Sequence, residues 1–386
     1  MQDFELWWLL VFPVFFGLGW LAARIDMRAV MEQARAVPAS YFRGLHALLD
    51  DNTEEAVAEL TEVARAQPRA FELALALGRL HRRRGENDLA IRLHQKMLED
   101  ADLPVLLKPR VRLELALDFV RSGLVDRAEE QLLQLLEGPL AADARQKLLD
   151  IYQQERDWPR AIEMARTLRT ESVSYQHEMA QFYCELAQQA LFKSRYDEAR
   201  AFLEDARLAN RRSARISLIA GDIELALGQH EAAISAWCEI EQQSAEYLSL
   251  AGERILNAYE HLGRAPEGVA LLRGWLSTFP DLDLVDLLYP RIVALDGDVA
   301  AVDFLREVLH VHPSLAGLAK LIDARFPTLT PESRQDAELA RELVLGHAKR
   351  LHVYRCRRCS FRSKTFFWHC PACNEWETLT PNRSEG

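Results

Sequence analysis

The feature that most constrains the fold is a repeat of small residues along the middle of the chain. Six alanines recur at a nearly regular interval of about 34 residues, namely Ala56, Ala90, Ala128, Ala161, Ala199 and Ala233. Gly44 and Gly78 are separated by the same interval, and each lies in the helix expected to precede one of these alanines. Because helices can approach closely only where side chains are short, the pattern predicts a stack of similar helix pairs.

Such a period is typical of tetratricopeptide repeats, in which each unit is a helix–turn–helix pair. Glycines fall where the turns of such pairs are expected, at Gly85, Gly123, Gly228 and Gly263. With only 17 Gly and 15 Pro in 386 residues, the composition also favours helix. We predict an all-α repeat array, a tetratricopeptide superhelix, within residues 29–345. It would hold about eight repeats over 37–316 and a helical cap over 318–350.

A long apolar stretch, residues 4–23, lies near the N-terminus, with Glu5 as its one charge. A helix of this length spans about 30 Å, the thickness of the hydrocarbon core of a bilayer. Acidic residues precede the stretch and arginines follow it, which favours an uncleaved anchor over a signal peptide. The positive-inside rule then places the short N-terminus outside and the bulk of the chain in the cytoplasm. We predict a transmembrane helix within residues 1–28.

The strongest chemical signal is a cluster of four cysteines near the C-terminus, within residues 346–386. Cys356, Cys359, Cys370 and Cys373 have the spacing C-x2-C-x10-C-x2-C. Each CxxC pair forms a tight turn that presents two thiolates to one ion, and two turns complete a tetrahedral site. Because sulfur fills all four positions, we expect a structural or electron-transferring ion, and both iron and zinc fit the pattern.

A unit of about 40 residues has too small a core to fold alone, so metal binding is expected to contribute to its folding. We expect its aromatic residues to supply the small core around the ion: Tyr354, Phe361, Phe366, Phe367, Trp368 and Trp376. His369 is expected to pack beside the site rather than to bind the ion. The aromatic residues of the array, among them Trp158 and Trp237, are expected to pack between helices.

Charge is unevenly distributed along the chain. The formal net charge is −11, but residues 349–386 carry eight Lys/Arg against three Glu, or +5, which leaves −16 on the rest. This asymmetry predicts that the basic module packs against the acidic array. An alternative is a membrane-tethered nucleic-acid-binding module, in which phosphates contact the cations around the cysteines, Arg357, Arg358, Arg362 and Lys364. The acidic array makes nucleic acid the less favoured partner, and a redox protein with iron in the four-cysteine site is a third hypothesis.

The sequence contains no motif that indicates catalysis. We find no HExxH, no GxSxG, no GxxxxGK[ST] and no GxGxxG after a strand. A repeat array instead presents an extended surface for peptides or proteins. The run from His81 to Arg84 could bind an acidic ligand or complement the end of its helix. We therefore predict a non-catalytic binding protein.

Two segments point to a known family. They are Phe182-Tyr183-Cys184-Glu185-Leu186-Ala187 in the array and Trp368-His369-Cys370-Pro371-Ala372-Cys373 at the C-terminus, the latter followed by Trp376 and Thr380-Pro381. Together with the apolar N-terminus and the repeats, they make the whole chain resemble the lipopolysaccharide assembly protein B family of Gram-negative bacteria.

The resemblance implies a regulatory role in lipid A synthesis. It implies an inner-membrane adaptor that couples the lipid A-pathway deacetylase to an ATP-dependent membrane zinc metalloprotease, which degrades the deacetylase. It also implies a platform for other lipopolysaccharide assembly proteins. By the same resemblance the C-terminal module is rubredoxin-like and lies against the repeats, with the four cysteines as its metal ligands, and the N-terminal helix is the anchor.

Overall fold

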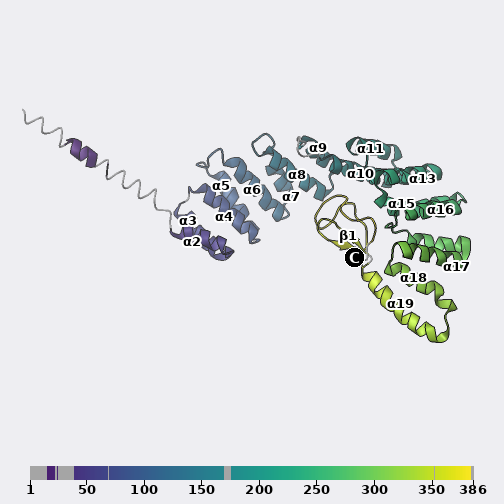
Figure 1. Cartoon of the computed structure of the whole chain (residues 1–386). Helices are drawn as coiled ribbons and strands as arrows, with labels where there is room; N and C mark the ends of the chain where they lie inside the picture. Colours follow the sequence, from purple (N-terminus) through teal and green to yellow (C-terminus); the bar gives the residue numbers. More distant parts are fainter. Residues whose placement is uncertain are drawn as a thin grey trace, which may run out of the picture. The chain divides into compact units, whose positions relative to one another are not determined.

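The computed structural model describes residues 15–21, 24, 39–67, 69–168, 175–351 and 353–383. The chain divides into two compact units, Met1–Ile151 and Tyr152–Gly386, which we describe separately. Both units are built from short antiparallel helix pairs (Figure 1).

Unit 1 contains three complete helix pairs within its described residues. They are α2 (Ala39–Leu49) with α3 (Thr53–Ala66), α4 (Phe71–Arg83) with α5 (Asn87–Glu99), and α6 (Lys108–Arg121) with α7 (Val125–Leu133). Helix α8 (Ala141–Glu155) begins in this unit and ends in the next.

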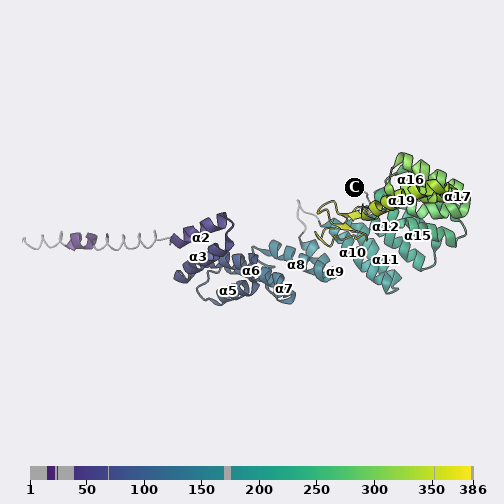
Figure 2. The same cartoon turned by 90° about the horizontal axis from the view of Figure 1, so that it is seen from below.

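Unit 2 continues the same pattern and ends in a small module with two short strands. Its helices are α9 (Trp158–Thr167), α10 (Gln176–Phe192), α11 (Tyr196–Ala209), α12 (Ala214–Ala226), α13 (His230–Cys238), α14 (Ile240–Ser244), α15 (Leu248–His261), α16 (Ala265–Thr278), α17 (Val285–Val311), α18 (Leu315–Arg325) and α19 (Pro331–Leu351), with 3-10 turns η2 (Ala245–Tyr247) and η3 (Phe326–Thr328). Strands β1 (Tyr354–Arg355) and β2 (Arg362–Ser363) are antiparallel, with Tyr354 opposite Ser363. In both views the module lies beside α10 (Figures 1 and 2).

Eight of the turns between described helices share one backbone feature, a residue with a positive φ. One residue in each turn has a positive φ between 55° and 84°: Asp51, Gly85, Gly123, Arg156, Ser194, Gly228, Gly263 and Gly297. Successive members of this set are one repeat, about 34 residues, apart. Gly297 has non-helical backbone angles and interrupts α17, so this long helix is itself a pair of helices joined by a turn. The left-handed conformation explains the frequent glycine, because a side chain is disfavoured there.

The periodic small residues lie where the helices pack most closely. All six alanines of the repeat are fully buried, at 0% exposure. A Cβ on Gly221 would lie 2.3 Å from Nε1 of Trp237, so the indole ring occupies the space that a side chain would need. These contacts, with the helix pairs, confirm the predicted helical repeat fold with a small C-terminal module. The predicted boundaries at residues 28 and 345 stay a prediction.

Unit 1 buries a network of charges between adjacent repeats. Asp118 of α6 is fully buried, lies 2.5 Å from Nδ1 of His94 on α5, and accepts a 2.7 Å hydrogen bond from Arg82 on α4. Glu114 accepts hydrogen bonds from both Arg79 and Arg82. Burial alone would raise the pKa of Glu114, but the two guanidinium groups lower it. The guanidinium of Arg82 is therefore bound to these two carboxylates, which corrects the hypothesis that Arg82 binds an acidic ligand.

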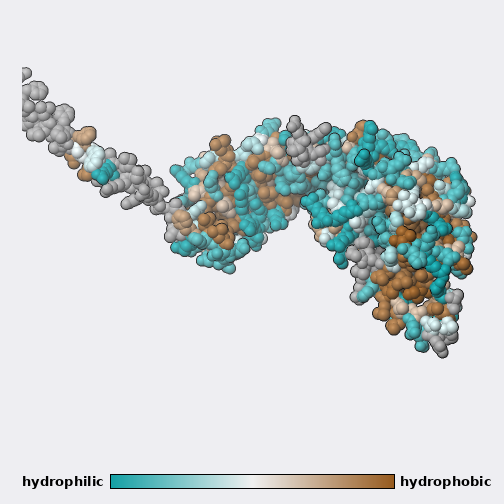
Figure 3. All heavy atoms as spheres, viewed as in Figure 1, coloured by the Kyte–Doolittle hydropathy of each residue, from teal (hydrophilic) through white to brown (hydrophobic). Residues whose placement is uncertain are grey.

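Most of the predicted membrane anchor, residues 4–23, lies outside the described residues. Among the helices that the structure describes, none is both long enough and apolar enough to cross a membrane. Residues 15–21 are helical, and large apolar side chains such as Phe16 are exposed there. Elsewhere, apolar residues gather on the surface over α18 and α19 (Figure 3), where Leu339 and Leu343 are exposed.

Candidate metal centre

Two turns of matching geometry present the four cysteines. In the first knuckle, residues 356–360, the N–H of Ser360 donates to the carbonyl of Cys356 at 3.0 Å. In the second knuckle, residues 370–374, the N–H of Asn374 donates to the carbonyl of Cys370 at 2.9 Å. Ser360 and Asn374 both adopt a positive φ, 61° and 56°, which closes each turn. The two knuckles therefore have the same backbone shape.

The four sulfur atoms converge on one point. All lie within 4.8 Å of one another, with Cys356 and Cys373 Sγ atoms 3.8 Å apart and those of Cys359 and Cys370 3.7 Å apart. Four sulfurs at about 2.3 Å from a central ion would be about 3.8 Å apart in a tetrahedron, so the spacing fits a tetrahedral zinc or iron ion. The backbone N–H of Cys359 also points to Cys356 Sγ, at 3.5 Å. The residues present therefore fit one four-coordinate ion.

Hydrogen bonds within the knuckles favour a thiolate at Cys356. Burial opposes the charged form, but the Thr378 hydroxyl, 3.3 Å away, and nearby backbone N–H groups lower the pKa of Cys356 to about 6. Burial and the neighbouring thiols raise the pKa of Cys373 to about 12. Four thiolates so close together repel one another, so the full set needs a cation at its centre.

An aromatic cluster joins the second knuckle to the repeats. The indole of Trp376 is 6% exposed and packs edge-on against Trp158 of α9 and Phe182 of α10, with ring centroids 5.9 Å apart in both cases. The ring of His369 also packs against Trp376, with ring centroids 4.5 Å apart, and burial lowers the pKa of His369. Trp376 thus fastens the module to two helices, and His369 packs beside the site as expected.

A carboxylate that is only 16% exposed, that of Glu377, forms a second attachment. Glu377 Oε1 accepts hydrogen bonds from Gln181 of α10 at 2.6 Å and from Ser213, the residue before α12, at 3.1 Å. Its other oxygen lies 3.5 Å from Nε2 of His177. Arg215 of α12 is 2% exposed, and its guanidinium lies 5.5 Å from the centroid of Trp368. The module therefore meets a polar, largely buried face of α10 and α12.

Further contacts continue along the array. The ring of Trp368 stacks on Tyr247 of η2 at 5.1 Å, and Arg357 pairs with Glu246 at 2.5 Å. Near the C-terminus, Arg383 pairs with Asp283 at 2.5 Å. These pairs join basic residues of the module to acidic residues of the array, as the charge asymmetry predicts.

The aromatic residues of the module are divided between two roles. Tyr354, Phe361 and Phe366 pack around the buried cysteines and Leu379, as expected. Trp368 and Trp376 instead turn outward onto the repeats, and Phe367 is 38% exposed, so the expectation that these three residues form the module's own core is wrong. A separate core of about 40 residues is too small to enclose two indole rings, and the array supplies the missing surface.

Sequence reasoning missed the polar residues that receive the module. These are Gln181, Ser213 and Arg215, none of which belongs to a recognisable motif. One signal was available, because Phe182 and Glu185 belong to the array segment that carries the family resemblance. Glu185 accepts a 2.6 Å hydrogen bond from Arg215 and so supports this face.

Family models of known proteins match both parts of the chain, the helical repeats and the cysteine module. A rubredoxin metal-binding domain model matches residues 354–381, and a tetratricopeptide-repeat model matches residues 43–102 and 184–247. The C-terminal part of a TPR repeat-containing protein from Cytophaga hutchinsonii is 12% identical, with a TM-score of 0.38, and covers 62% of this chain and 95% of that one. The fold and the cysteine site thus define a tetratricopeptide-repeat protein with a rubredoxin-like module.

Full-length relatives identify the family. The chain is 31% identical to lipopolysaccharide assembly protein B of Escherichia coli strain K12 over 383 residues, which is 98% of each chain. It is 29% identical over 399 residues to the protein of the same name from Haemophilus influenzae, again with 98% of each chain covered. The chain belongs to the lipopolysaccharide assembly protein B family, which confirms the resemblance drawn from the sequence.

Proposed function

We propose that this protein is a non-catalytic adaptor in lipopolysaccharide assembly at the inner membrane. The observation that carries the proposal is the match to proteins named lipopolysaccharide assembly protein B over 98% of the chain, through both the repeats and the module. Helical repeats bind proteins through extended surfaces, which suits an adaptor.

The adaptor would bring a protease to its substrate. We propose that it promotes degradation of the lipid A-pathway deacetylase by an ATP-dependent membrane zinc metalloprotease, and that it coordinates other lipopolysaccharide assembly proteins. Two clients on one scaffold meet at a high effective concentration, so no chemistry by the scaffold is needed. The apolar stretch 4–23 would hold the scaffold at the membrane, with the bulk of the chain in the cytoplasm.

Cys356, Cys359, Cys370 and Cys373 would hold one ion, iron or zinc. When bound, a four-thiolate ion of this kind supplies a rigid cross-link between the two knuckles. The matched knuckle geometry and the sulfur spacing of 3.7 and 3.8 Å support this assignment. Elemental analysis of the purified protein distinguishes the metals, since an iron site of this type also colours the protein and a zinc site does not.

The nucleic-acid alternative is less well supported. Of the four cations around the knuckles, Arg357 pairs with Glu246, and Arg358 pairs with Glu375 at 2.7 Å. These pairs neutralise part of the basic surface that phosphates would contact. Salt-dependent binding of RNA or DNA by the full chain, lost in Arg362→Ala with Lys364→Ala, would favour the alternative.

The half-life of the deacetylase after translation is blocked tests the adaptor role. Cells with the intact protein, cells without it, and cells with Cys356→Ser plus Cys370→Ser are compared, with Cys238→Ser as a control outside the metal site. We expect the half-life to lengthen at least several-fold without the protein and in the double variant, but not in the control. An unchanged half-life without the protein would refute the proposed role.

A further inference from the structure

The last residues of the module run along the repeats in register with the array. Positions 181, 215, 249 and 283 are successive members of one series, each one repeat of about 34 residues after the last. Gln181 contacts Glu377, Arg215 lies against Trp376 with 5.8 Å to the ring centroid, and Ser249 donates to the carbonyl of Pro381 at 3.3 Å. The fourth member, Asp283, binds Asn382 and Arg383.

Three of these contacts follow the same order in the tail, residues 376–383, and in the array. Glu377 meets Gln181 of α10, Pro381 meets Ser249 of α15, and Arg383 meets Asp283 just before α17. Trp376, at the start of the tail, lies instead against Arg215 of α12. The tail contains no helix. An extended peptide bound along the inner surface of a repeat array would make contacts in the same way, because repeats present equivalent side chains at regular intervals.

The two ends of the surface beneath the tail bind groups of opposite charge. At α10, Gln181 donates to the carboxylate of Glu377 and His177 lies 3.5 Å from it, while Arg215 of α12 is paired with Glu185 and lies against Trp376. At the other end Asp283 and Asp286 face the guanidinium of Arg383, at 2.5 and 3.5 Å. The surface therefore fits a segment with an acidic residue at one end and a basic residue six positions later.

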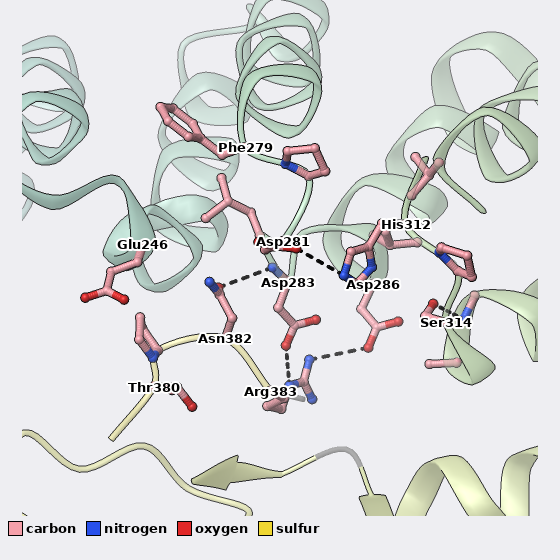
Figure 4. Close-up of a pocket in the computed structure, with 18 of the residues that line it drawn as sticks. Glu246, Phe279, Asp281, Asp283, Asp286, His312, Ser314, Thr380, Asn382 and Arg383 are labelled. Carbon is pink, nitrogen blue, oxygen red and sulfur yellow. Dashed lines mark hydrogen bonds and ion pairs between the residues drawn. The ribbon is translucent and has the colours of Figure 1, made fainter. Parts of the chain in front are cut away.

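The acidic end has room for more than the tail fills. A cavity of about 670 Å³ lies beside Asn382 and Arg383, and its walls include Asp281, Asp286 and His312 (Figure 4). In addition, Nε of the buried Arg215 has no hydrogen-bond partner among the described residues, so the other end retains a donor. Both features indicate a surface that can accept a different segment from the one now on it.

We propose that this surface is a binding groove for an extended segment of a partner protein, and that the tail occupies it as a ligand from the same chain. The partner segment would carry a carboxylate where Glu377 lies and an arginine or lysine where Arg383 lies. This inference rests on the proposed adaptor function. It adds the chemistry of the partner segment and a way in which binding of that segment is controlled.

Release of the tail depends on the metal module. The N–H of Arg357 donates to the carbonyl of Thr378 at 2.8 Å, and the N–H of Thr380 donates to the carbonyl of Arg355 at 3.0 Å. The tail is thus paired with the chain around the first knuckle. Because the ion holds the knuckles together, its loss would loosen the tail and open the groove to a partner.

Binding of a synthetic peptide to the full chain tests the proposal. The probe is a fluorescein-labelled peptide with the sequence of residues 376–383, measured by fluorescence anisotropy. In the weakened chain, Glu377→Ala with Arg383→Ala removes the two charged groups through which the tail contacts the groove. A matched control, Lys364→Ala with Glu375→Ala, removes one charge of each sign elsewhere in the same module. The charge-swapped peptide carries Glu377→Lys and Arg383→Glu.

We expect the weakened chain to bind the peptide at least 10-fold more tightly than the intact chain and the control, because a tethered ligand competes at about millimolar effective concentration. Cys356→Ser with Cys370→Ser should bind it at least as tightly as the weakened chain does. The charge-swapped peptide should bind none of them. Equal affinity for intact and weakened chains, with helical circular dichroism retained in both, would overturn the proposal, as would equal binding of the two peptides. Neither result depends on the deacetylase half-life, so the two proposals fail separately.

Discussion

The two units bury polar groups for different purposes. In unit 1, the buried carboxylates of Glu114 and Asp118 are bound by Arg79, Arg82 and His94 within the array. In unit 2, Gln181, Ser213 and Arg215 are buried at least in part by the C-terminal module, to which they bind. The same repeat fold is thus complete by itself in one unit and depends on an added module in the other.

The difference shows which part of a repeat array can bind one particular partner. The buried charges of unit 1 are paired with one another across adjacent repeats and so fix how those repeats pack. Polar side chains on the inner surface of unit 2 instead require a partner that supplies the matching groups. Unit 1 is therefore held by its own buried ion pairs, whereas unit 2 presents the surface that receives the module.

The largest expected effect comes from loss of the metal ligands. Cys356→Ser with Cys370→Ser should unfold the module, because such an ion contributes on the order of 10 kcal/mol to the folding of a small domain. Helices α10 and α12 should lose protection in hydrogen–deuterium exchange, since their buried polar groups lose their partners. Helices α4 to α6 should remain unchanged, as should the whole chain in the Cys238→Ser control. Equal loss of protection in both units would contradict the comparison.

A substitution in unit 1 should reduce hydrogen-exchange protection in unit 1 and leave the module protected. Asp118→Ala leaves Arg82 and His94 buried without their shared carboxylate, which should cost about 3–5 kcal/mol of unfolding free energy. Urea unfolding, with hydrogen exchange to locate the change, should show the loss in α4 to α6 while the module stays protected. Asp126→Ala, at an exposed position of α7, is the control and should change the stability by no more than about 0.5 kcal/mol. A small effect of Asp118→Ala would mean that the network does not hold the repeats together.

Trp376 tests how strongly the module is attached. Trp376→Ala removes the ring that packs on Trp158 and Phe182 and should cost about 3–5 kcal/mol. Limited proteolysis should then release the module while the four-cysteine site still binds metal. Phe367→Ala, at a ring that is 38% exposed, should release the module no faster than the intact protein does. Loss of metal in Trp376→Ala would show instead that the array is needed to form the site.

The sequence predicted those features that are repeated or chemically unusual. The spacing of the alanines predicted the stacked helices, because close packing requires small residues at each repeat. The cysteine spacing predicted two knuckles, because few other arrangements place four thiols together. The partner of Glu377 could not be predicted in this way, since Gln181 and Ser213 share no motif with each other. Arg215 would normally be assigned to the surface, and its burial is explained by Glu185 and Gln188 of α10 together with the two tryptophans of the module.

The turns were predicted only where glycine marks them. Asp51, Arg156 and Ser194 adopt the same positive φ as the glycines of other repeats, although their side chains disfavour it. The packing of the flanking helices imposes this conformation, so neither composition nor local propensity reveals it. The repeat length was therefore a better guide to turn positions than the turn residues themselves.

The smallest expected effect concerns this shared turn and should be the same in both units. Gly85→Ala in unit 1 and Gly263→Ala in unit 2 each place a side chain at a positive φ, 81° and 69°, and should each cost about 1 kcal/mol. No atom lies within 4 Å of either new Cβ, so the cost is one of backbone conformation alone. Gly274→Ala, in the interior of α16 and equally free of contacts, should instead stabilise the protein by up to about 1 kcal/mol. Urea unfolding of the three variants with and without metal measures these effects. If the unfolding free energy lost in Gly263→Ala depends on the metal, the module sets even the local geometry of unit 2. If the loss is the same with and without metal, the influence of the module is limited to the inner surface of the repeats.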